Sequence, residues 1–417
     1  MLPTRGRGEG SARWRRTASV PRAAPPRYAP SVPELADLRE LLDRACERAH
    51  PPAASACAIV DREVVHESAH GASPDGAPTR VESVFDVASV TKVAATTLAV
   101  ARLLNEGALE LDGAVARWLP AFGARGKERV TVRELLGHRS GLPAWAPLFL
   151  DAREPLARGD FTAARAQVIG AALDAPLGPP GQRVYSDLGF IALGALLEAA
   201  AGARLDALVR ASLYDPLGLD LGFVDLARPP RWLADRHVLP TGRTRPREPA
   251  PGQEHLYSVP PQPPRDHTGE VDDDNAFAMG GVAGHAGLFG TARALAQLGA
   301  LIARSIDGDD RLGVGDTLRA FAAIDPAHGP ARGLGFDRPA AQGSSAGARL
   351  GQAGPRGAIG HLGFTGCSLW IDLDRRLSVA LLTNRTYPGR QHVEPLRALR
   401  PAFHDRLCRA IDGVAAR

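Results

Sequence analysis

The spacing of apolar and polar positions predicts helices and strands that are unevenly spread along the chain. Helical spacing covers 32–50, and again about 89–106, where Gly107 ends the pattern. Two short runs rich in strand-forming residues, 55–61 and 62–71, follow the first helix with a tight connection between them. The first part of the chain therefore predicts a helix, a pair of strands and a long second helix.

The last part of the chain repeats this mixture in a different order. A helical pattern spans 291–306, a Gly/Ala-rich break covers 338–358, and two strand patterns follow at 368–374 and 377–385. A further helical stretch closes the chain. Because strands cluster at both ends, we predict an α+β protein with one antiparallel sheet built from both chain ends, flanked by helices.

Between these ends lies a mainly helical region, which gives a division into four parts. They are a basic arm at 1–32, the first part of an α/β domain at 33–110, an inserted helical region at 111–279 and the second part of the domain at 280–417. Inside the insertion, the Pro/Gly/Arg-rich stretch 228–269 is too long for an ordinary loop, so we expect it to be disordered or to line a site.

Composition and charge restrict the possible partners. With 44% apolar and 23% charged residues among 417, the chain has a globular composition. The net charge is +4, but residues 1–32 contain seven Arg and one Glu, so the rest of the chain is near −2 (4 − 6). We expect the arm to be disordered, and the folded part shows no basic patch typical of a nucleic-acid partner.

Targeting signals are equally sparse. No apolar run approaches 18 residues, so no membrane span is expected. Arg15-Arg16 precedes a stretch without the apolar core of a signal peptide. As written, the sequence predicts a cytoplasmic protein, with a periplasmic or secreted location only if its start is wrongly assigned.

The metal-binding and thiol residues follow no recurrent spacing. The four cysteines lack a C-x-x-C pair, and we expect them to be buried free thiols. His285 and the acidic run 272–274 do not repeat the spacing of a ligand set. We therefore predict neither a metal nor another cofactor.

The candidate chemistry begins with the rarity of lysine. Of the 50 basic residues only Lys92 and Lys127 are lysine, and Lys92 lies three residues after Ser89 at the start of a predicted helix. Positions i and i+3 share a helix face, which brings the hydroxyl and the amine within hydrogen-bond reach. We expect burial and the helix N-terminus to lower the pKa of Lys92, so that its neutral amine can act as a base. Arginine cannot do this, because it does not lose its proton in a protein.

Chance is a weak explanation for this pair. With 17 serines and two lysines in 417 residues, about 0.08 Ser-x-x-Lys matches are expected at random. The structural alternative is a helix-capping serine beside a lysine that extends to solvent. We interpret Ser89 as a nucleophile with Lys92 as its activating partner.

Four further segments carry a resemblance to a known family. They are LLGHRSGL (135–142), Tyr185-Ser186-Asp187, DNAFAMGGVAGHAGLFGTA (274–292) and GHLGFTGCSLWIDLD (360–374). Together with SVTK they resemble motifs of the serine β-lactamase and penicillin-binding-protein superfamily, in particular its class C-like esterase and D-aminopeptidase branch. The resemblance extends from about residue 33 to 412 and implies the β-lactamase-like fold.

The resemblance also implies roles for individual residues. Ser89 would be acylated, and Tyr185 would relay protons. Either Lys92 or Tyr185 could be the base, so we assign this role to the two residues jointly as a coupled pair. The backbone N–H groups of Ser89 and Phe364 would form the oxyanion hole. The segment 360–374 corresponds to the family's third motif, Lys/His-Thr-Gly, on an edge strand. His361 would occupy the place of the lysine in that motif.

Two departures from the family pattern affect the substrate. Asp187, where asparagine is usual, only accepts hydrogen bonds when ionised. His361 is a weaker anchor for a carboxylate than lysine. With Gly363 these residues would contact the substrate, and they argue against β-lactams and D-Ala-D-Ala peptides. Arg385 offers a positive charge, but we expect it to be a surface residue.

These observations predict a serine hydrolase that forms an acyl-enzyme on small esters or amides. Small acyl esters are the first choice of substrate, followed by D-amino-acid amides or peptides and weak β-lactamase activity. The alternative is a weakly active or inactive relative that binds a peptidoglycan-like ligand. The sequence makes no prediction of oligomeric state.

Overall fold

The computed structural model describes most of the chain. The described residues are 33–48, 50–179, 182–247, 263–323 and 333–415. The basic arm predicted at 1–32, and the middle of the loop predicted at 228–269, lie outside these residues.

A five-stranded antiparallel sheet forms the centre of the fold. Its strand order is β2-β1-β8-β7-β6, so the first hairpin pairs with the last strands of the chain. The strands are β1 (Ala53–Val60), β2 (Glu63–Gly71), β6 (Ala358–Leu362), β7 (Ser368–Asp372) and β8 (Leu377–Thr383). The prediction of one antiparallel sheet built from both chain ends is confirmed.

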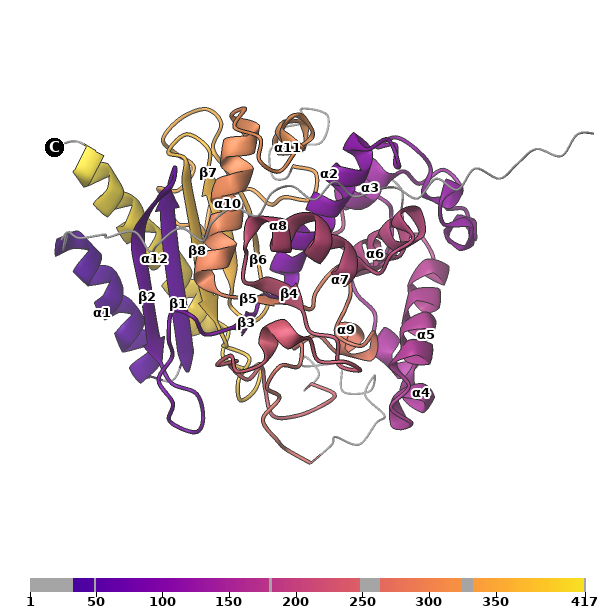
Figure 1. The fold of residues 1–417 in the computed structure, drawn as a ribbon, viewed down its shortest axis with the longest axis horizontal. Helices are drawn as coiled ribbons and strands as arrows, with labels where there is room; N and C mark the ends of the chain where they lie inside the picture. The colour runs from indigo at the N-terminus through magenta and orange to yellow at the C-terminus, as the bar shows by residue number, and fades with distance from the viewer. Residues whose placement is uncertain (1–32, 49, 180–181, 248–262, 324–332, 416–417) are drawn as a thin grey trace, which may run out of the picture.

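Helices cover both faces of this sheet. The terminal helices α1 (Pro33–Glu47) and α12 (Glu394–Ala415) pack on one face, and α10 (Ala292–Ile306) packs on the other (Figure 1). All four cysteines are buried and free, as expected.

Strand β1 shows how the sequence matches these two covered faces. Ala54, Ala56 and Ala58 belong to the apolar cluster beneath the terminal helices, whereas Cys57 and Ile59 belong to the main core that contains α10. Since successive side chains of a strand point to opposite faces, a central strand between two helix layers is apolar at almost every position.

The middle of the chain forms a helical region beside the sheet (Figure 1). Its α-helices are α2 (Leu98–Asn105), α3 (Val132–Leu136), α4 (Arg153–Ala157), α5 (Phe161–Asp174), α6 (Asp187–Ala201), α7 (Leu205–Val209), α8 (Asp215–Leu217) and α9 (Asp274–Ala278). Helix α11 (Gly315–Ala322) follows α10. Short 3-10 or π turns are η3 (Val115–Arg117), η4 (Pro120–Gly123), η5 (Leu148–Leu150), η6 (Arg210–Tyr214) and η7 (Arg231–Leu233).

Helix α6 is apolar around most of its circumference, because it is buried from Leu188 to Leu197.

Within the described ranges, no single helix is long and apolar enough to cross a membrane. The helical segments Asp187–Ala201 and Leu205–Leu217 are long and apolar enough when taken together, but they meet at a bend of 70°.

A second, three-stranded sheet was not predicted. It has the order β3-β5-β4, with β3 (Phe85–Asp86), β5 (Leu288–Gly290) and β4 (Leu221–Phe223). Strands of two or three residues are too short for an alternating pattern to reveal. This small sheet fixes the chain just before Ser89.

The helix predicted from about Ser89 to Glu106 consists of three pieces. A 3-10 turn, η1 (Ala88–Val90), precedes a π-helical segment, η2 (Lys92–Thr97), and α2 completes the rod. Other parts of the chain bond to the wider segment: the Tyr214 hydroxyl donates to the carbonyl of Ala94 at 2.9 Å. Such π segments are frequent at functional sites.

Gly299 allows α10 to lie close to the sheet, and we predict that it does not tolerate a side chain. A Cβ at Gly299 would lie 2.2 Å from Ser378 Oγ and 3.0 Å from Leu369 Cδ1. We expect Gly299→Ala to lower the free energy of unfolding by about 1–3 kcal/mol, because overpacking forces the helix away from the sheet.

The matched control is Gly170→Ala on α5, where a Cβ would meet nothing within 4 Å. Alanine favours the helix there by up to about 1 kcal/mol. Urea unfolding of both variants measures the difference, and equal stabilities would contradict the assigned packing.

Candidate active site

The predicted nucleophile follows a strained backbone position. Ala88 has a positive φ of 47°, a conformation that costs an L-residue about 1–2 kcal/mol. Asp86 supports this turn, since its carboxylate accepts from the N–H of Ala88 at 2.8 Å and from the N–H of Asp272 at 2.7 Å. Burial raises the pKa of Asp86 to about 7, against the lowering effect of these two hydrogen bonds. Ser89 is thus presented by a turn that a buried carboxyl group holds from inside.

Lys92 is completely buried and lies at the centre of the site. Its Nζ donates to Ser89 Oγ at 3.0 Å, to Asp187 Oδ1 at 2.7 Å and to the carbonyl of His285 at 3.2 Å. An ammonium has three N–H donors, whereas a neutral amine has only two. Three acceptors around one nitrogen therefore favour the charged form of Lys92.

The expected lowering of the Lys92 pKa is wrong for this structure. Burial does lower this pKa, but the Asp187 carboxylate and Tyr185 outweigh burial and raise it to about 12. The family resemblance implies only a substrate contact for Asp187, and it does not predict this ion pair with a lysine 95 residues away. Lys92 is held as an ammonium in the resting site.

Tyr185 lies between the lysine and the predicted nucleophile. Its hydroxyl is hydrogen-bonded to Lys92 and Ser89, and Lys92 Nζ lies 4.9 Å from the ring centroid. Burial raises the pKa of Tyr185, and the positive charge of Lys92 opposes that rise. The phenol is therefore in contact with both groups of the Ser-x-x-Lys pair.

The start of α6 fixes the positions of Tyr185 and Asp187. Ser186 caps the helix by accepting from the N–H of Gly189 at 3.0 Å, and its own N–H donates to His138 Nδ1 at 3.0 Å. His138, from the LLGHRSGL segment, also packs against the Tyr185 ring at 4.6 Å between centroids. The two segments thus form one supporting unit.

His285 connects Lys92 to a second carboxylate. Its carbonyl accepts from Lys92, and its ring Nε2 lies 2.9 Å from Asp273 Oδ1. The pKa of Asp273 is well below its usual range: burial would raise it, but the His285 ring and a backbone hydrogen bond outweigh burial. The sequence shows this segment as part of the family resemblance and His285 as a metal candidate, and neither observation predicts the contact with Lys92.

The third motif lies on the edge strand β6, as the resemblance implied. His361 is buried, its Nδ1 lies 2.7 Å from the carbonyl of Leu362, and its ring centroid is 5.8 Å from that of Tyr185. Gly363 follows directly, and a Cβ there would lie 2.5 Å from the carbonyl of Val87. Only glycine lets the end of β6 come this close to the nucleophile turn.

Phe364 begins the turn between β6 and β7. Thr365 fastens this turn to the nucleophile segment, because its hydroxyl donates to the carbonyl of Asp86 at 2.8 Å. The Phe364 ring is 51% exposed and lies under the guanidinium groups of Arg385 and Arg390, at 4.3 and 5.2 Å from its centroid. Arg385 is 4% exposed, so the expectation of a surface arginine is wrong.

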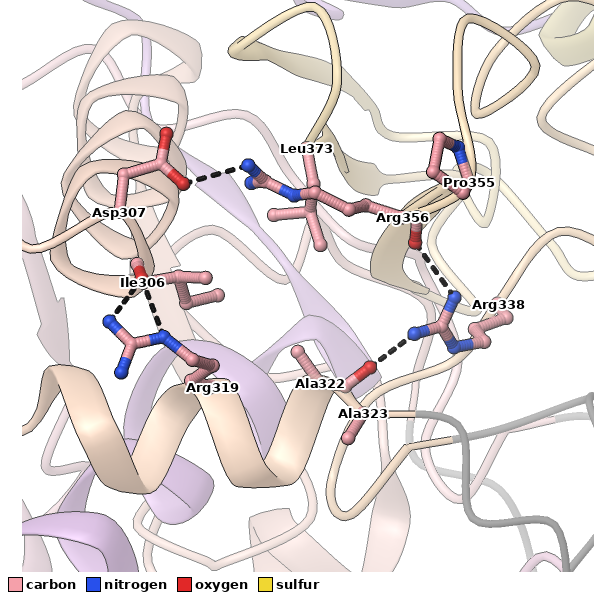
Figure 2. Close-up of a pocket in the computed structure, with 9 residues that line it drawn as sticks. All are labelled: Ile306, Asp307, Arg319, Ala322, Ala323, Arg338, Pro355, Arg356 and Leu373. Atoms are coloured by element: carbon pink, nitrogen blue, oxygen red, sulfur yellow. Dashed lines mark hydrogen bonds and ion pairs between the residues drawn. The ribbon is translucent and has the colours of Figure 1, made fainter.

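A cavity of about 460 Å³ lies elsewhere, at the ends of α10 and α11, and none of the predicted site residues lines it (Figure 2). Its arginines bond to the protein itself. Arg319 donates to the carbonyl of Ile306, Arg338 donates to the carbonyls of Ala322 and Arg356, and Arg356 pairs with Asp307. These contacts connect the surrounding segments.

The part of the chain that the structure describes contains no group of three or more His, Cys, Asp or Glu that would hold a metal ion. His285, one of the residues considered for a metal, instead pairs with Asp273. The polar side chains of the site are thus engaged with one another.

A serine hydroxyl bonded to a buried lysine, rather than to histidine, is the arrangement of one class of serine hydrolases that work through an acyl-enzyme. The chain belongs to the β-lactamase family: the family model described as Beta-lactamase matches residues 38–402. It is a serine hydrolase of that family.

Named relatives and solved structures agree with this membership. The chain is similar to an N-acetylmuramyl-L-alanine amidase of Bacillus subtilis, with 29% identity over 81% of the chain and 78% of the relative. It is also similar to a putative D-alanyl-D-alanine carboxypeptidase of Escherichia coli K12, with 28% identity over 81% of the chain and 79% of the relative.

Two solved structures share the fold. A penicillin-binding protein homologue from Caulobacter crescentus has a TM-score of 0.66 and 23% identity, covering 92% of this chain and 98% of that chain. EstCE1, a hydrolase with promiscuous acyltransferase activity, has a TM-score of 0.64 and 22% identity, covering 90% and 99%.

We predict that Lys92 remains protonated up to about pH 10 or above, because its pKa of about 12 exceeds the ordinary 10.5. The ion pair then stabilises the fold fully below pH 10.5 and loses this contribution as the pH rises through about 12. NMR of protein with isotope-labelled lysine measures this directly, because the sequence contains only two lysines.

Lys127→Arg assigns the two signals. Asp187→Asn should lower the pKa of Lys92, since burial then acts without the opposing carboxylate. A wild-type Lys92 that titrates near neutral pH would refute the ion-pair interpretation.

Proposed function

We propose that Ser89 is the nucleophile of this hydrolase, and that Lys92, Asp187 and Tyr185 together move its proton. The observation that carries the proposal is the fully buried Lys92 ammonium, which contacts the Ser89 hydroxyl at 3.0 Å and the Asp187 carboxylate at 2.7 Å. These distances allow a proton to pass along the line from serine to carboxylate.

In acylation, the Ser89 oxygen forms a bond to the substrate carbonyl carbon as its proton leaves. Lys92 already has three protons, so it accepts this proton only by giving another to Asp187. The net result is a protonated Asp187, an unchanged ammonium and a tetrahedral intermediate whose negative charge lies on the former carbonyl oxygen. Asp187 therefore acts as a proton acceptor as well as a counter-ion.

The tetrahedral intermediate then collapses, and the bond to the leaving group breaks. Tyr185 touches both Ser89 and Lys92, so it delivers a proton to the leaving group and regains one through Lys92 from Asp187. The same path in reverse activates the water that hydrolyses the acyl-enzyme. The main-chain N–H groups of Ser89 and Phe364 hold the oxyanion in both steps.

For the substrate, we propose an amide of the kind found in peptidoglycan fragments, ahead of small esters. The two curated relatives described above are named an amidase and a putative carboxypeptidase. Asp187 is 17% exposed and accepts hydrogen bonds only, so it favours an amide or ammonium N–H near the scissile bond. A substrate carboxylate at this place would be repelled.

The first test is covalent labelling of the nucleophile. A fluorophosphonate should add once to the wild-type protein and not to Ser89→Ala, as read by intact-protein mass spectrometry. Tyr185→Phe should lower kcat by about 100- to 10,000-fold, because it removes the proton relay. A label that persists in folded Ser89→Ala would exclude Ser89 as the nucleophile.

The second test compares substrates. We expect D-Ala-p-nitroanilide, which has an ammonium and no carboxylate, to give a higher kcat/KM than nitrocefin, with p-nitrophenyl acetate measuring the ester alternative. In Asp187→Asn, the ratio of nitrocefin to neutral-ester turnover should rise, since a repulsive charge is removed. An unchanged ratio would contradict the role of Asp187 in substrate choice.

A further inference from the structure

Arg400, on helix α12, contacts the turn that connects the edge strand β6 to β7. It is 9% exposed, and its guanidinium donates to three main-chain carbonyls. Nη2 bonds to the carbonyl of Gly363 at 2.8 Å and of Cys367 at 2.7 Å, and Nε bonds to that of Gly366 at 3.0 Å. One side chain from the last helix thus contacts both ends of the turn.

The contact with Gly363 fixes more than one carbonyl. The carbonyl of Gly363 and the N–H of Phe364 belong to the same peptide unit, which is planar and, when trans, points the two groups in opposite directions. Holding the carbonyl toward α12 therefore directs the N–H of Phe364 away from α12. The turn also lies against the segment that precedes Ser89, since a Gly363 Cβ would lie 2.5 Å from the carbonyl of Val87.

The turn needs such support because its own residues allow several conformations. Gly363 and Gly366 lack a side chain, and Gly366 has a φ of +98°. The opposite side of the turn is fastened through Thr365, whose hydroxyl donates to Asp86 and whose carbonyl accepts from the N–H of Arg385 at 3.1 Å. On the carbonyl side, the N–H of Gly366 donates to the carbonyl of Gly363 at 3.1 Å, and the N–H of Gly363 donates to that of Cys367 at 2.7 Å. Arg400 adds a charged donor to both carbonyls.

The charge of Arg400 adds to this geometry. Burial lowers the pKa of Arg400 to about 10, so the guanidinium remains charged at neutral pH. A cation bonded to a peptide carbonyl polarises the peptide and strengthens its N–H as a donor. The fixed orientation and the polarisation both favour an anion at the N–H of Phe364.

We propose that Arg400 is a positioning residue that aims the Phe364 N–H at the oxyanion of the reaction. This inference rests on the proposed function, in which that N–H and the N–H of Ser89 bind the oxyanion. Arg400 acts through the peptide that it holds and does not itself touch the substrate.

The test compares Arg400→Met and Arg400→Lys with Arg397→Met, a control one turn earlier on the same helix. The Arg397 side chain is 70% exposed and pairs only with Glu394 at the surface among the contacts that are described. Loss of an entire oxyanion donor costs about 100- to 1,000-fold in kcat. We expect Arg400→Met to lower kcat about 10- to 100-fold with KM nearly unchanged, Arg400→Lys to recover part of the loss, and Arg397→Met to behave as wild type.

An arylboronic acid, which forms a tetrahedral adduct with a serine nucleophile, separates positioning from general destabilisation. Its Ki should rise in proportion to the loss of kcat/KM in each Arg400 variant, at a temperature where thermal melting shows the protein folded. Wild-type kcat in folded Arg400→Met, or a loss confined to KM, would overturn the proposal. If Arg400→Met does not fold, Arg400→Lys decides by the same criteria.

Failure of the proposed function would look different. In that case the wild-type protein would resist the fluorophosphonate, or Ser89→Ala would still be labelled. A wild type labelled at Ser89, together with a fully active Arg400→Met, would remove only the role of Arg400.

Discussion

A completely buried ammonium must be surrounded by acceptors, and much of the site depends on meeting that requirement for Lys92. Three of its acceptors are the Ser89 hydroxyl, the Asp187 carboxylate, 95 residues along the chain, and the carbonyl of His285, 193 residues along. Removing one partner from a buried ion pair typically costs about 3–5 kcal/mol, because the remaining charge is uncompensated. The nucleophile turn, the start of α6 and the segment before β5 are therefore held together by the same cation that contacts the serine.

An aspartate at this place changes the charge balance of the site. Asp187 supplies a full negative charge beside Lys92, so the pair is neutral while Tyr185 remains a phenol. An asparagine would leave the lysine without a counter-ion, and the neutral amine or a tyrosinate would then have to provide the balance. The departure from the family pattern thus places the charges of the resting site on Lys92 and Asp187.

Periodicity and motif spacing predicted the parts of the fold that depend on local pattern. The central sheet follows from apolar strands at both chain ends, and Ser89, Lys92 and Tyr185 are in contact as their motifs implied. The small sheet before the nucleophile was missed because strands of two or three residues show no period. The protonation state of Lys92 was misjudged, because it depends on an ion pair between residues far apart in the sequence. Arg400 was likewise one arginine among 48 until the fold placed it behind the turn.

The pairing of β1 with β8 also limits the order in which the parts of the site can assemble. These strands join residues 53–60 to 377–383, so the central sheet cannot close until residues 377–383 have been synthesised. Contacts so distant in sequence fold slowly, because a long loop must be ordered before they form. Ser89 and Lys92 leave the ribosome well before strand β6 and helix α12. A nascent chain therefore contains the Ser-x-x-Lys pair long before it contains the edge strand and the turn that lie against this pair.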